Sequence, residues 1–301
     1  MFSKYIEDPM KVFEVSVKFF RDKLIKDGLE SLVLGVSGGA DSTLMAAICH
    51  EAVKGLDGVR FLGYSLPTKT NKEDEKSRAE EVIEAFCTFG EVFPIGEIVN
   101  LKIKQFGIGN DEDNLIILDP NDTHKIKVRA GNIKARTRME FLYDTANQFN
   151  GIVVSTDNLT EYMLGFWTVH GDVGDHCAIQ YIWKSEVYDI MTAVAEMYQK
   201  SGESLKAKVL IDSINAKPTD GLGVSNSDFD QFGFEADVLS RLKPRDVYRL
   251  VEDILNDYIE AKATNDLEAM KVLEQNKIIK LHNRSHFKRK GPEILSRELL
   301  V

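Results

Sequence analysis

Apolar residues along this chain switch repeatedly between two kinds of spacing. They recur every three or four positions over about residues 10–26, which predicts a helix with one buried face. Continuous apolar runs at 32–36, 59–66, 92–95 and 152–154 predict buried strands, and helix-like spacing returns between them. This alternation predicts an α/β fold: a doubly wound parallel sheet flanked by helices, with ligands at the carboxyl ends of the strands.

The remaining segments complete this outline. Apolar spacing toward the end of the chain predicts a helical C-terminal extension over about residues 243–301. Two stretches, 106–127 and 217–234, lack clear periodicity, and the second carries Asp-Gly, Ser and Asn turn signals. We therefore expect loops there, and a single domain over residues 1–301.

Composition narrows the classes of protein that fit. The 301 residues are 43% hydrophobic with a formal net charge of −10, so we expect a soluble globular protein that does not bind long nucleic acid. Neither a secretion signal nor a membrane-spanning apolar run is visible. Cys49, Cys87 and Cys177 stand far apart, which predicts neither disulfides nor a zinc site and fits a cytoplasmic location.

The hexapeptide Ser37-Gly38-Gly39-Ala40-Asp41-Ser42 follows a predicted strand and opens a predicted helix. Backbone N–H groups and a helix N-terminus converge on a phosphate in that setting, and the serine hydroxyls add donors. Asp41 suits a phosphate only with Mg²⁺ between them, so it implies a metal. A tight turn in which Asp41 or Ser42 caps the helix is the alternative. The string is neither a Walker A loop nor Gly-x-Gly-x-x-Gly.

The hexapeptide resembles the pyrophosphate loop of N-type ATP pyrophosphatases, enzymes that cut ATP between the α and β phosphates. Further strings match, in order and spacing, the ammonia-dependent NAD synthetases of that group, whose fold is adenine nucleotide alpha-hydrolase-like. They are Gly131-Asn-Ile-Lys-Ala-Arg-Thr-Arg-Met139, Ser155-Thr-Asp-Asn-Leu-Thr-Glu161, Gly165-Phe-Trp-Thr168, Gly171-Asp172, Lys184 and Lys217-Pro-Thr219. The resemblance covers about residues 10–242.

The resemblance implies a set of site residues. Those expected to bind ATP are Gly35, Ser37, Gly38, Gly39, Asp41, Ser42, Thr156, Lys184 and Thr219. Those expected to bind deamido-NAD are Arg136, Asp175, His286 and Lys288. Asp41 and Glu161 are the expected Mg²⁺ ligands, and Asp41 and Lys184 the catalytic residues, with Lys184 offsetting charge on the α phosphate as pyrophosphate leaves. Taken alone, Lys184 would be a surface residue, and Arg136 an exposed partner of Glu140.

The substrate end departs from the family pattern. Val169 stands where the family commonly has a lysine that binds deamido-NAD, and His170 next to it is a possible replacement. The segment 171–176 is one residue shorter than usual, so we place the substrate-binding aspartate at Asp175, with His176 as the alternative. His286 and Lys288 match a C-terminal His-Lys pair with one residue inserted, and a solvated basic tail is the other interpretation.

The resemblance implies an enzyme that adenylates deamido-NAD with ATP and Mg²⁺ and passes the acyl group to ammonia, giving NAD, AMP and pyrophosphate. It also implies a homodimer with substrate at its interface. The glycine turn begins at Ser37, which leaves no room upstream for a glutaminase domain, so we expect free ammonia or a separate donor protein. Two alternatives stay open: a tRNA-modifying adenylating enzyme of the same group, and a catalytically altered nucleotide-binding homologue.

Overall fold

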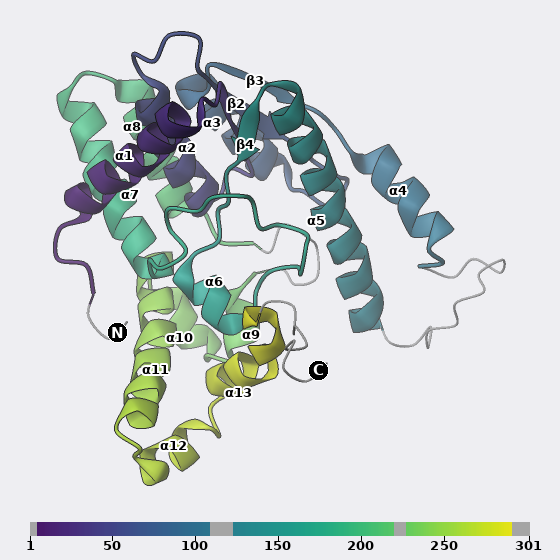
Figure 1. The fold of residues 1–301 in the computed structure, drawn as a ribbon. Coiled ribbons are helices and arrows are strands. Elements are labelled where there is room, and N and C mark those ends of the chain that lie inside the picture. The colour runs from purple at the N-terminus through teal and green to yellow at the C-terminus, as the bar shows by residue number, and fades with distance from the viewer. Residues whose placement is uncertain (1–4, 109–122, 220–226, 291–301) are drawn as a thin grey trace, which may run out of the picture.

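The computed structural model describes residues 5–108, 123–219 and 227–290, which surround a four-stranded sheet (Figure 1). The strands are β1 (Ser31–Gly35), β2 (Arg60–Ser65), β3 (Phe89–Val92) and β4 (Gly151–Val153). Their order is β3-β2-β1-β4 and every neighbouring pair is parallel. The predicted α/β class with a parallel sheet is confirmed.

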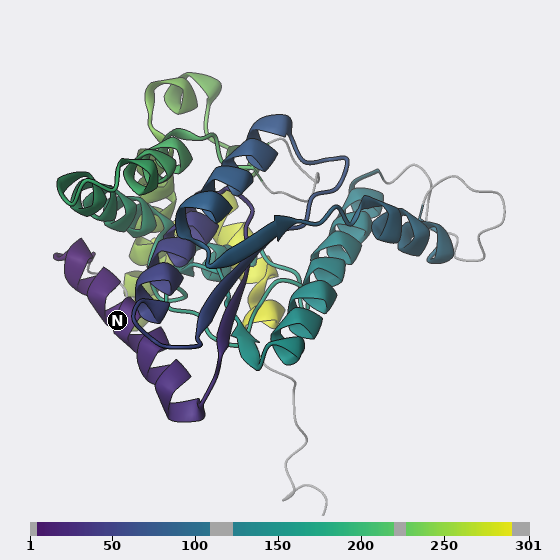
Figure 2. The ribbon, with the colours of Figure 1, turned by 90° about the horizontal axis from the view of Figure 1, so that it is seen from above.

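Helices cover both faces of the sheet, because the side chains of β1 alternate between two apolar cores. Leu32 and Leu34 pack on one side, and Val33 packs on the other. On the first side lie α1 (Pro9–Asp27), α2 (Ala40–Val53), α3 (Glu73–Phe86), α7 (Lys184–Lys200) and α8 (Ser204–Asn215). On the second lie α4 (Gly96–Gln105) and α5 (Thr123–Gln148), as Figure 2 shows.

Local sequence accounts for the first helix. The Asp8 side chain accepts the Lys11 N–H, Pro9 occupies the first turn, and Gly28 ends the helix in the left-handed conformation at φ +64°. The helix predicted over about 10–26 is therefore present with its expected ends.

The third strand lies three residues before its predicted place. Residues 92–95 are the apolar run, but β3 is Phe89–Val92, and Ile95 is the buried N-cap of α4. β3 is an edge strand whose side chains are alternately exposed and half-buried, so continuous apolarity does not mark it.

The two predicted loops overlap segments outside the described residues. Of 106–127, residues 109–122 lie outside them, and 123–127 are already the start of α5, so the loop prediction is wrong for those five. Of 217–234, residues 220–226 lie outside them, and a short helix, α9 (Phe229–Phe232), follows.

The described residues end in the predicted helical extension, and residues 291–301 of that prediction lie outside them. The extension consists of α11 (Pro244–Ala263), α12 (Leu267–Leu273), α13 (Lys277–Arg284) and a 3-10 turn, His286–Arg289. Two shorter helices precede it: α6 (Leu159–Leu164) and α10 (Ala236–Arg241). α11 packs on both α6 and α7, so the extension is joined to the elements that follow β4. Within the described ranges, no helix has the length and apolarity to cross a membrane.

Candidate active site

The glycine turn leaves the carboxyl end of β1 and enters α2, as the sequence predicts. Gly38 has φ +76°, and a Cβ there would lie 2.8 Å from backbone atoms of Glu75 and Ala79 in α3, so only glycine fits. The hydroxyls of Ser37 and Ser42 are 2.9 Å apart, and Ser37 Oγ also accepts the Gly39 N–H at 3.2 Å. Two hydroxyls and the first turn of α2 are thus held in one place, an arrangement of donors that suits an anion.

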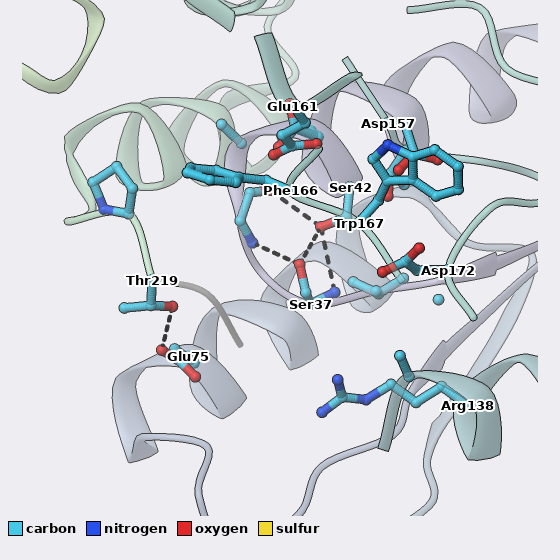
Figure 3. A pocket seen from close by; sticks show the side chains of 18 of the residues that line it. Ser37, Ser42, Glu75, Arg138, Asp157, Glu161, Phe166, Trp167, Asp172 and Thr219 are labelled. Atoms are coloured by element: carbon cyan, nitrogen blue, oxygen red, sulfur yellow. Dashed lines mark hydrogen bonds between the residues drawn. The ribbon is translucent and has the colours of Figure 1, made fainter. Parts of the chain in front are cut away.

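A cavity of about 460 Å³ opens beside this turn (Figure 3). Its wall combines the turn with α3, α5, the segment from Val154 to Asp172, the start of α7, residues 216–219 and the start of α9. The turn, α3 and the segment from Val154 follow the carboxyl ends of β1, β2 and β4, where ligands of parallel sheets bind. The volume is in the range of small-molecule sites.

Three charged residues from remote parts of the sequence meet in the cavity wall. Lys184 Nζ contacts Asp41 Oδ2 and lies 3.4 Å from Glu161 Oε1. Burial lowers the pKa of Lys184, but the two carboxylates raise it more, so the lysine stays charged. Burial raises the pKa of the Glu161 carboxyl well above its usual range, against the opposing effect of Lys184.

Asn158 links the two carboxylate-bearing elements. Its Oδ1 accepts the Glu161 N–H at 3.0 Å and so caps α6, while its Nδ2 donates to Asp41 Oδ1 at 3.0 Å. One side chain therefore fixes where both carboxylates lie. Residues 155–161 form this arrangement directly after β4, the strand beside β1.

Two further carboxylates face the same cavity. Burial raises the pKa of Asp157 to about 6 and that of Asp172 to about 7, and Asp157 adds to the shift at Asp172. Both Asp172 oxygens accept the Thr168 N–H at 2.9 Å. Asp172 is thus a carboxyl group that can gain and lose a proton near neutral pH.

An aromatic residue beside these carboxylates offers an unused donor. The Nε1 of Trp167 is buried and has no hydrogen-bond partner among the described residues. Trp167 lines the same cavity as Asp157 and Asp172 (Figure 3). A buried donor of this kind is stabilised when a bound ligand supplies an acceptor.

The far rim of the cavity joins the segment after α8 to α3. Thr219 Oγ1 donates to Glu75 Oε1 at 2.7 Å, and the same carboxylate caps α3 through the Lys72 N–H (Figure 3). Arg138 in α5 donates to the Leu66 carbonyl and completes this side.

Most of the predicted ATP and metal residues line the cavity. They are Gly35, Ser37, Gly39, Asp41, Ser42, Thr156, Glu161, Lys184 and Thr219. Gly38 lies behind the turn against α3, where its role is conformational. Lys288 also lines the cavity, and its Nζ donates to the carbonyls of Gly165 and Trp167.

Three residues predicted to bind deamido-NAD are not part of the cavity wall. Arg136 is exposed and donates to the Val169 carbonyl at 3.1 Å, and His286 is exposed. Asp175 is exposed, and it accepts the Val153 N–H at 2.9 Å and the Tyr143 hydroxyl at 3.1 Å. Of the two aspartates, Asp172 lines the cavity and Asp175, the residue predicted from the shortened spacing, does not.

Sequence reasoning missed Asp172, Asp157, Trp167, Glu75 and Arg138 as cavity residues. Asp172, Asp157 and Trp167 lie in strings that resemble the family, and these strings follow the strand β4. Their position after a strand could therefore have indicated that they line the site. Arg138 lies in the matching string 131–139 and so had a sequence signal too. Glu75 has none, because a charged residue in a helix is ordinarily solvated.

A parallel sheet whose first strand ends in an anion-binding turn, beside a buried cluster of acids and a lysine, defines a nucleotide-binding α/β protein suited to phosphate chemistry. The model of the NAD synthase family matches residues 12–292. The chain therefore belongs to the NAD synthase family.

Relatives and solved structures agree with that membership. The NH(3)-dependent NAD(+) synthetase of Methanosarcina acetivorans is 28% identical over 92% of this chain and 94% of its own length. That of Thermococcus kodakarensis is 30% identical over 85% of this chain and 83% of its own length. The NMN synthetase of Francisella tularensis and the NH3-dependent NAD synthetase of Campylobacter jejuni share the fold, with TM-scores of 0.67 and 0.61. Each of these structures is 23% identical, and each comparison covers 97% of this chain and 100% of the other.

Proposed function

We propose that this chain amidates deamido-NAD (nicotinic acid adenine dinucleotide) with ammonia, using ATP. The nicotinate carboxylate attacks the α phosphorus of ATP, and the bond to pyrophosphate breaks. Ammonia then attacks the acyl carbon of the adenylate, AMP leaves, and the nitrogen loses a proton. Membership of the NAD synthase family and the meeting of Asp41, Glu161 and Lys184 beside the glycine turn support this function.

The glycine turn is the proposed pyrophosphate site. Ser37 and Ser42 hydroxyls and the amides at the start of α2 donate to the β and γ phosphates, and Thr156 and Thr219 contact ATP from the walls on either side. Lys184 stabilises negative charge on the α phosphate. The protein acts by holding two anionic reactants in line, since nothing in this arrangement requires covalent catalysis.

Asp41 and Glu161 are the proposed ligands of Mg²⁺. Mg²⁺ keeps several waters and takes one or two carboxylates together with substrate phosphates, so two acids fit it without a third protein ligand. The Asn158 contact that fixes both residues supports this assignment. When bound, the ion supplies charge neutralisation for the departing pyrophosphate.

Asp172 is the proposed acceptor of the proton that ammonia loses. Its pKa, raised to about 7 by burial, suits a general base near neutral pH. Asp157 beside it adds negative charge that favours an ammonium ion over other small molecules. This carboxylate pair stands at the end of the cavity where Trp167 offers its unpartnered N–H to the substrate.

The rest of deamido-NAD is proposed to lie across the rim toward Arg136, Lys288 and His286. Because Arg136 and His286 are exposed, they are available to a substrate shared with a second copy of the chain, and we propose a homodimer with substrate at its interface. We also propose that residues 1–301 act as one domain and that the enzyme works in the cytoplasm, which fits three cysteines that are all free thiols.

One assay tests the function directly. Purified protein with ATP, Mg²⁺, ammonia and deamido-NAD should form NAD, AMP and pyrophosphate in equal amounts, and omission of any component should stop all three. Nicotinic acid mononucleotide in place of deamido-NAD measures how much the altered Val169 region contributes to substrate choice. Absence of pyrophosphate release with either substrate would point instead to a nucleotide-binding homologue.

A further inference from the structure

The helix that carries Lys184 supplies one capping acceptor of its own, because Glu186 accepts the Trp183 N–H at 2.8 Å. The N-cap residue of α7 is Trp183, whose indole offers no acceptor, and its side chain makes no capping hydrogen bond. The first N–H groups of a helix have no partner within the helix, and leaving them unpaired in a buried place is costly. Lys184 and Ser185 are both buried, so acceptors must come from elsewhere.

Those acceptors come from α6 and from the C-terminal extension. The Lys184 N–H donates to Thr160 Oγ1 at 3.0 Å, and the Ser185 N–H donates to Glu252 Oε1 at 3.0 Å. Thr160 Oγ1 in turn donates to Glu252 Oε1 at 2.8 Å, and the Ser185 hydroxyl donates to the other Glu252 oxygen. One carboxylate of α11 thus holds the first turn of α7 and the residue next to Glu161.

Glu252 lies in the buried stripe of α11 and has no exposed surface. Its neighbours in that stripe, Val247, Val251 and Leu255, are apolar. A buried carboxyl group is tolerated only where donors satisfy it, and three donors converge on this one.

One turn earlier on α11, Tyr248 contacts the lysine itself. Lys184 Nζ lies 5.6 Å from the centre of the Tyr248 ring, and the Tyr248 hydroxyl donates to Asp228 at 2.8 Å. Residues four apart on a helix share a face, so one surface of α11 presents Tyr248 to the Lys184 side chain and Glu252 to the backbone N–H of the next residue, Ser185.

We propose that Glu252 is a positioning residue that aims Lys184 at the reacting phosphate, so that the C-terminal extension is part of the catalytic machinery. The inference rests on the proposed role of Lys184. Glu252 acts through backbone atoms of α7 and through Thr160 and does not touch the substrate. Tyr248 supports the same lysine through its ring.

The test compares Glu252→Met, which keeps the length but removes both acceptors, with Glu252→Gln, which keeps an acceptor. In the glutamine variant the amide oxygen accepts the Ser185 N–H and the Thr160 hydroxyl, and the amide nitrogen donates to Ser185 Oγ. Glu252→Met should lower kcat for NAD formation by up to about 100-fold, the effect of misplacing a catalytic group by about 1 Å, with KM for deamido-NAD little changed. Glu252→Gln should stay within about threefold of wild type.

The matched control is Asp189→Asn, because Asp189 also joins α7 to α11, through Arg245 and Arg249, but further from Lys184. It should change stability and leave kcat unaltered. An equal fall in kcat for Asp189→Asn and Glu252→Met, or a Glu252→Met enzyme with wild-type kcat, would overturn the proposal. If Glu252→Met does not fold, Thr160→Val takes its place, since it removes the acceptor of the Lys184 N–H.

Hydrogen exchange separates this proposal from the proposed function. The amides of Lys184 and Ser185 should exchange faster in Glu252→Met and not in Asp189→Asn, whatever reaction the enzyme catalyses. Unchanged exchange in Glu252→Met overturns the capping role by itself. Lys184→Met completes the set: if it retains full kcat, the role of the lysine has failed, and the exchange data still show whether Glu252 caps α7.

Discussion

Lys184 and Asp41 form a buried ion pair although they stand 143 positions apart in the sequence, with 7% and 14% of their side chains exposed. Glu161 adds a second carboxylate to the same lysine at 3.4 Å. Removing one member of such a group leaves the others with unbalanced charge in a place that water reaches poorly. The site can therefore be tested by changes that alter charge and preserve volume.

Asp41→Asn and Glu161→Gln should each reduce turnover by at least about 100-fold and leave the fold intact, because each removes a proposed Mg²⁺ ligand without removing volume. Steady-state rates as a function of Mg²⁺ concentration measure the loss of turnover, and a thermal melt checks that the fold is intact. Glu196→Gln, an exposed acid on α7 that pairs only loosely with Lys200, is the control and should behave as wild type. Near-normal kinetics in either site variant would contradict the metal assignment.

The sequence predicts the sheet and the glycine turn because both depend on local patterns. Buried strands appear in the sequence as continuous apolar runs. The turn between β1 and α2 needs a glycine at position 38, because the backbone there is left-handed and leaves no room for a side chain. The apolar run at 92–95 misplaces β3 because an edge strand that is half exposed has no continuous apolar run of its own. The fold class can therefore be predicted from the sequence, but the exact position of the edge strand β3 cannot.

The candidate site depends less on local sequence patterns than the fold does. Asp41, Thr156 and Lys184 can be named because they lie in strings shared with a family, but spacing cannot choose between Asp172 and Asp175 once a residue is missing. The structure separates them by direction: Asp172 faces the cavity, and Asp175 bonds back to β4. Glu252 carries no sequence signal, since an acid in an amphipathic helix ordinarily lies on the solvated face.

Asp172→Asn should block amide formation and spare adenylation, because the proton leaves the nitrogen only after the acyl adenylate has formed. Exchange of labelled pyrophosphate into ATP should persist, while NAD formation should fall by about 100- to 10,000-fold, the usual contribution of a general base. Asp175→Asn is the matched control: it replaces one of the two carboxylate oxygens, which accept the Val153 N–H and the Tyr143 hydroxyl, with an amide nitrogen, so it should lower stability without changing kcat. Equal loss of both partial reactions in Asp172→Asn would show that the carboxylate acts earlier.

Glu252→Gln should make stability less dependent on pH. Burial raises the pKa of Glu252 to about 7 from 4.5, so the folded protein holds a proton that the unfolded chain releases. That stabilisation is complete below the unfolded pKa and is lost as pH rises through about 7. From about pH 5.5 to 8 the wild type should lose about 2 kcal/mol relative to the glutamine variant, at about 1.4 kcal/mol per unit up to the folded pKa.

Urea unfolding of both proteins at the two pH values measures this difference directly. All other titrating groups are shared, so they cancel in the comparison. Glu196→Gln, whose carboxylate is exposed, should differ from wild type by the same amount at both pH values. A glutamine variant that follows the wild-type pH dependence would mean that Glu252 is charged throughout.

Val169 is the departure with the clearest consequence for substrate binding. Its carbonyl accepts a hydrogen bond from Arg136, and its neighbours Thr168 and Gly171 line the cavity, so residue 169 lies at the rim where the dinucleotide is proposed to pass. The C-terminal cations do not simply replace the missing lysine, because Lys288 and Arg289 already donate to backbone carbonyls of residues 163–167.

Val169→Lys should therefore lower KM for deamido-NAD and leave KM for ATP nearly unchanged, since the two ligands use different ends of the site. One charge-assisted hydrogen bond contributes about 1.5 to 3 kcal/mol, or roughly ten- to a hundredfold in affinity. Val173→Lys, which adds the same charge to an exposed position of the same loop outside the cavity wall, should have little effect. If His170 already supplies the charge, Val169→Lys gains nothing and His170→Ala raises KM instead. If Val169→Lys, His170→Ala and removal of the Lys288 charge all leave KM for deamido-NAD unchanged, the substrate lies elsewhere, because none of these three cations would then be within reach of it.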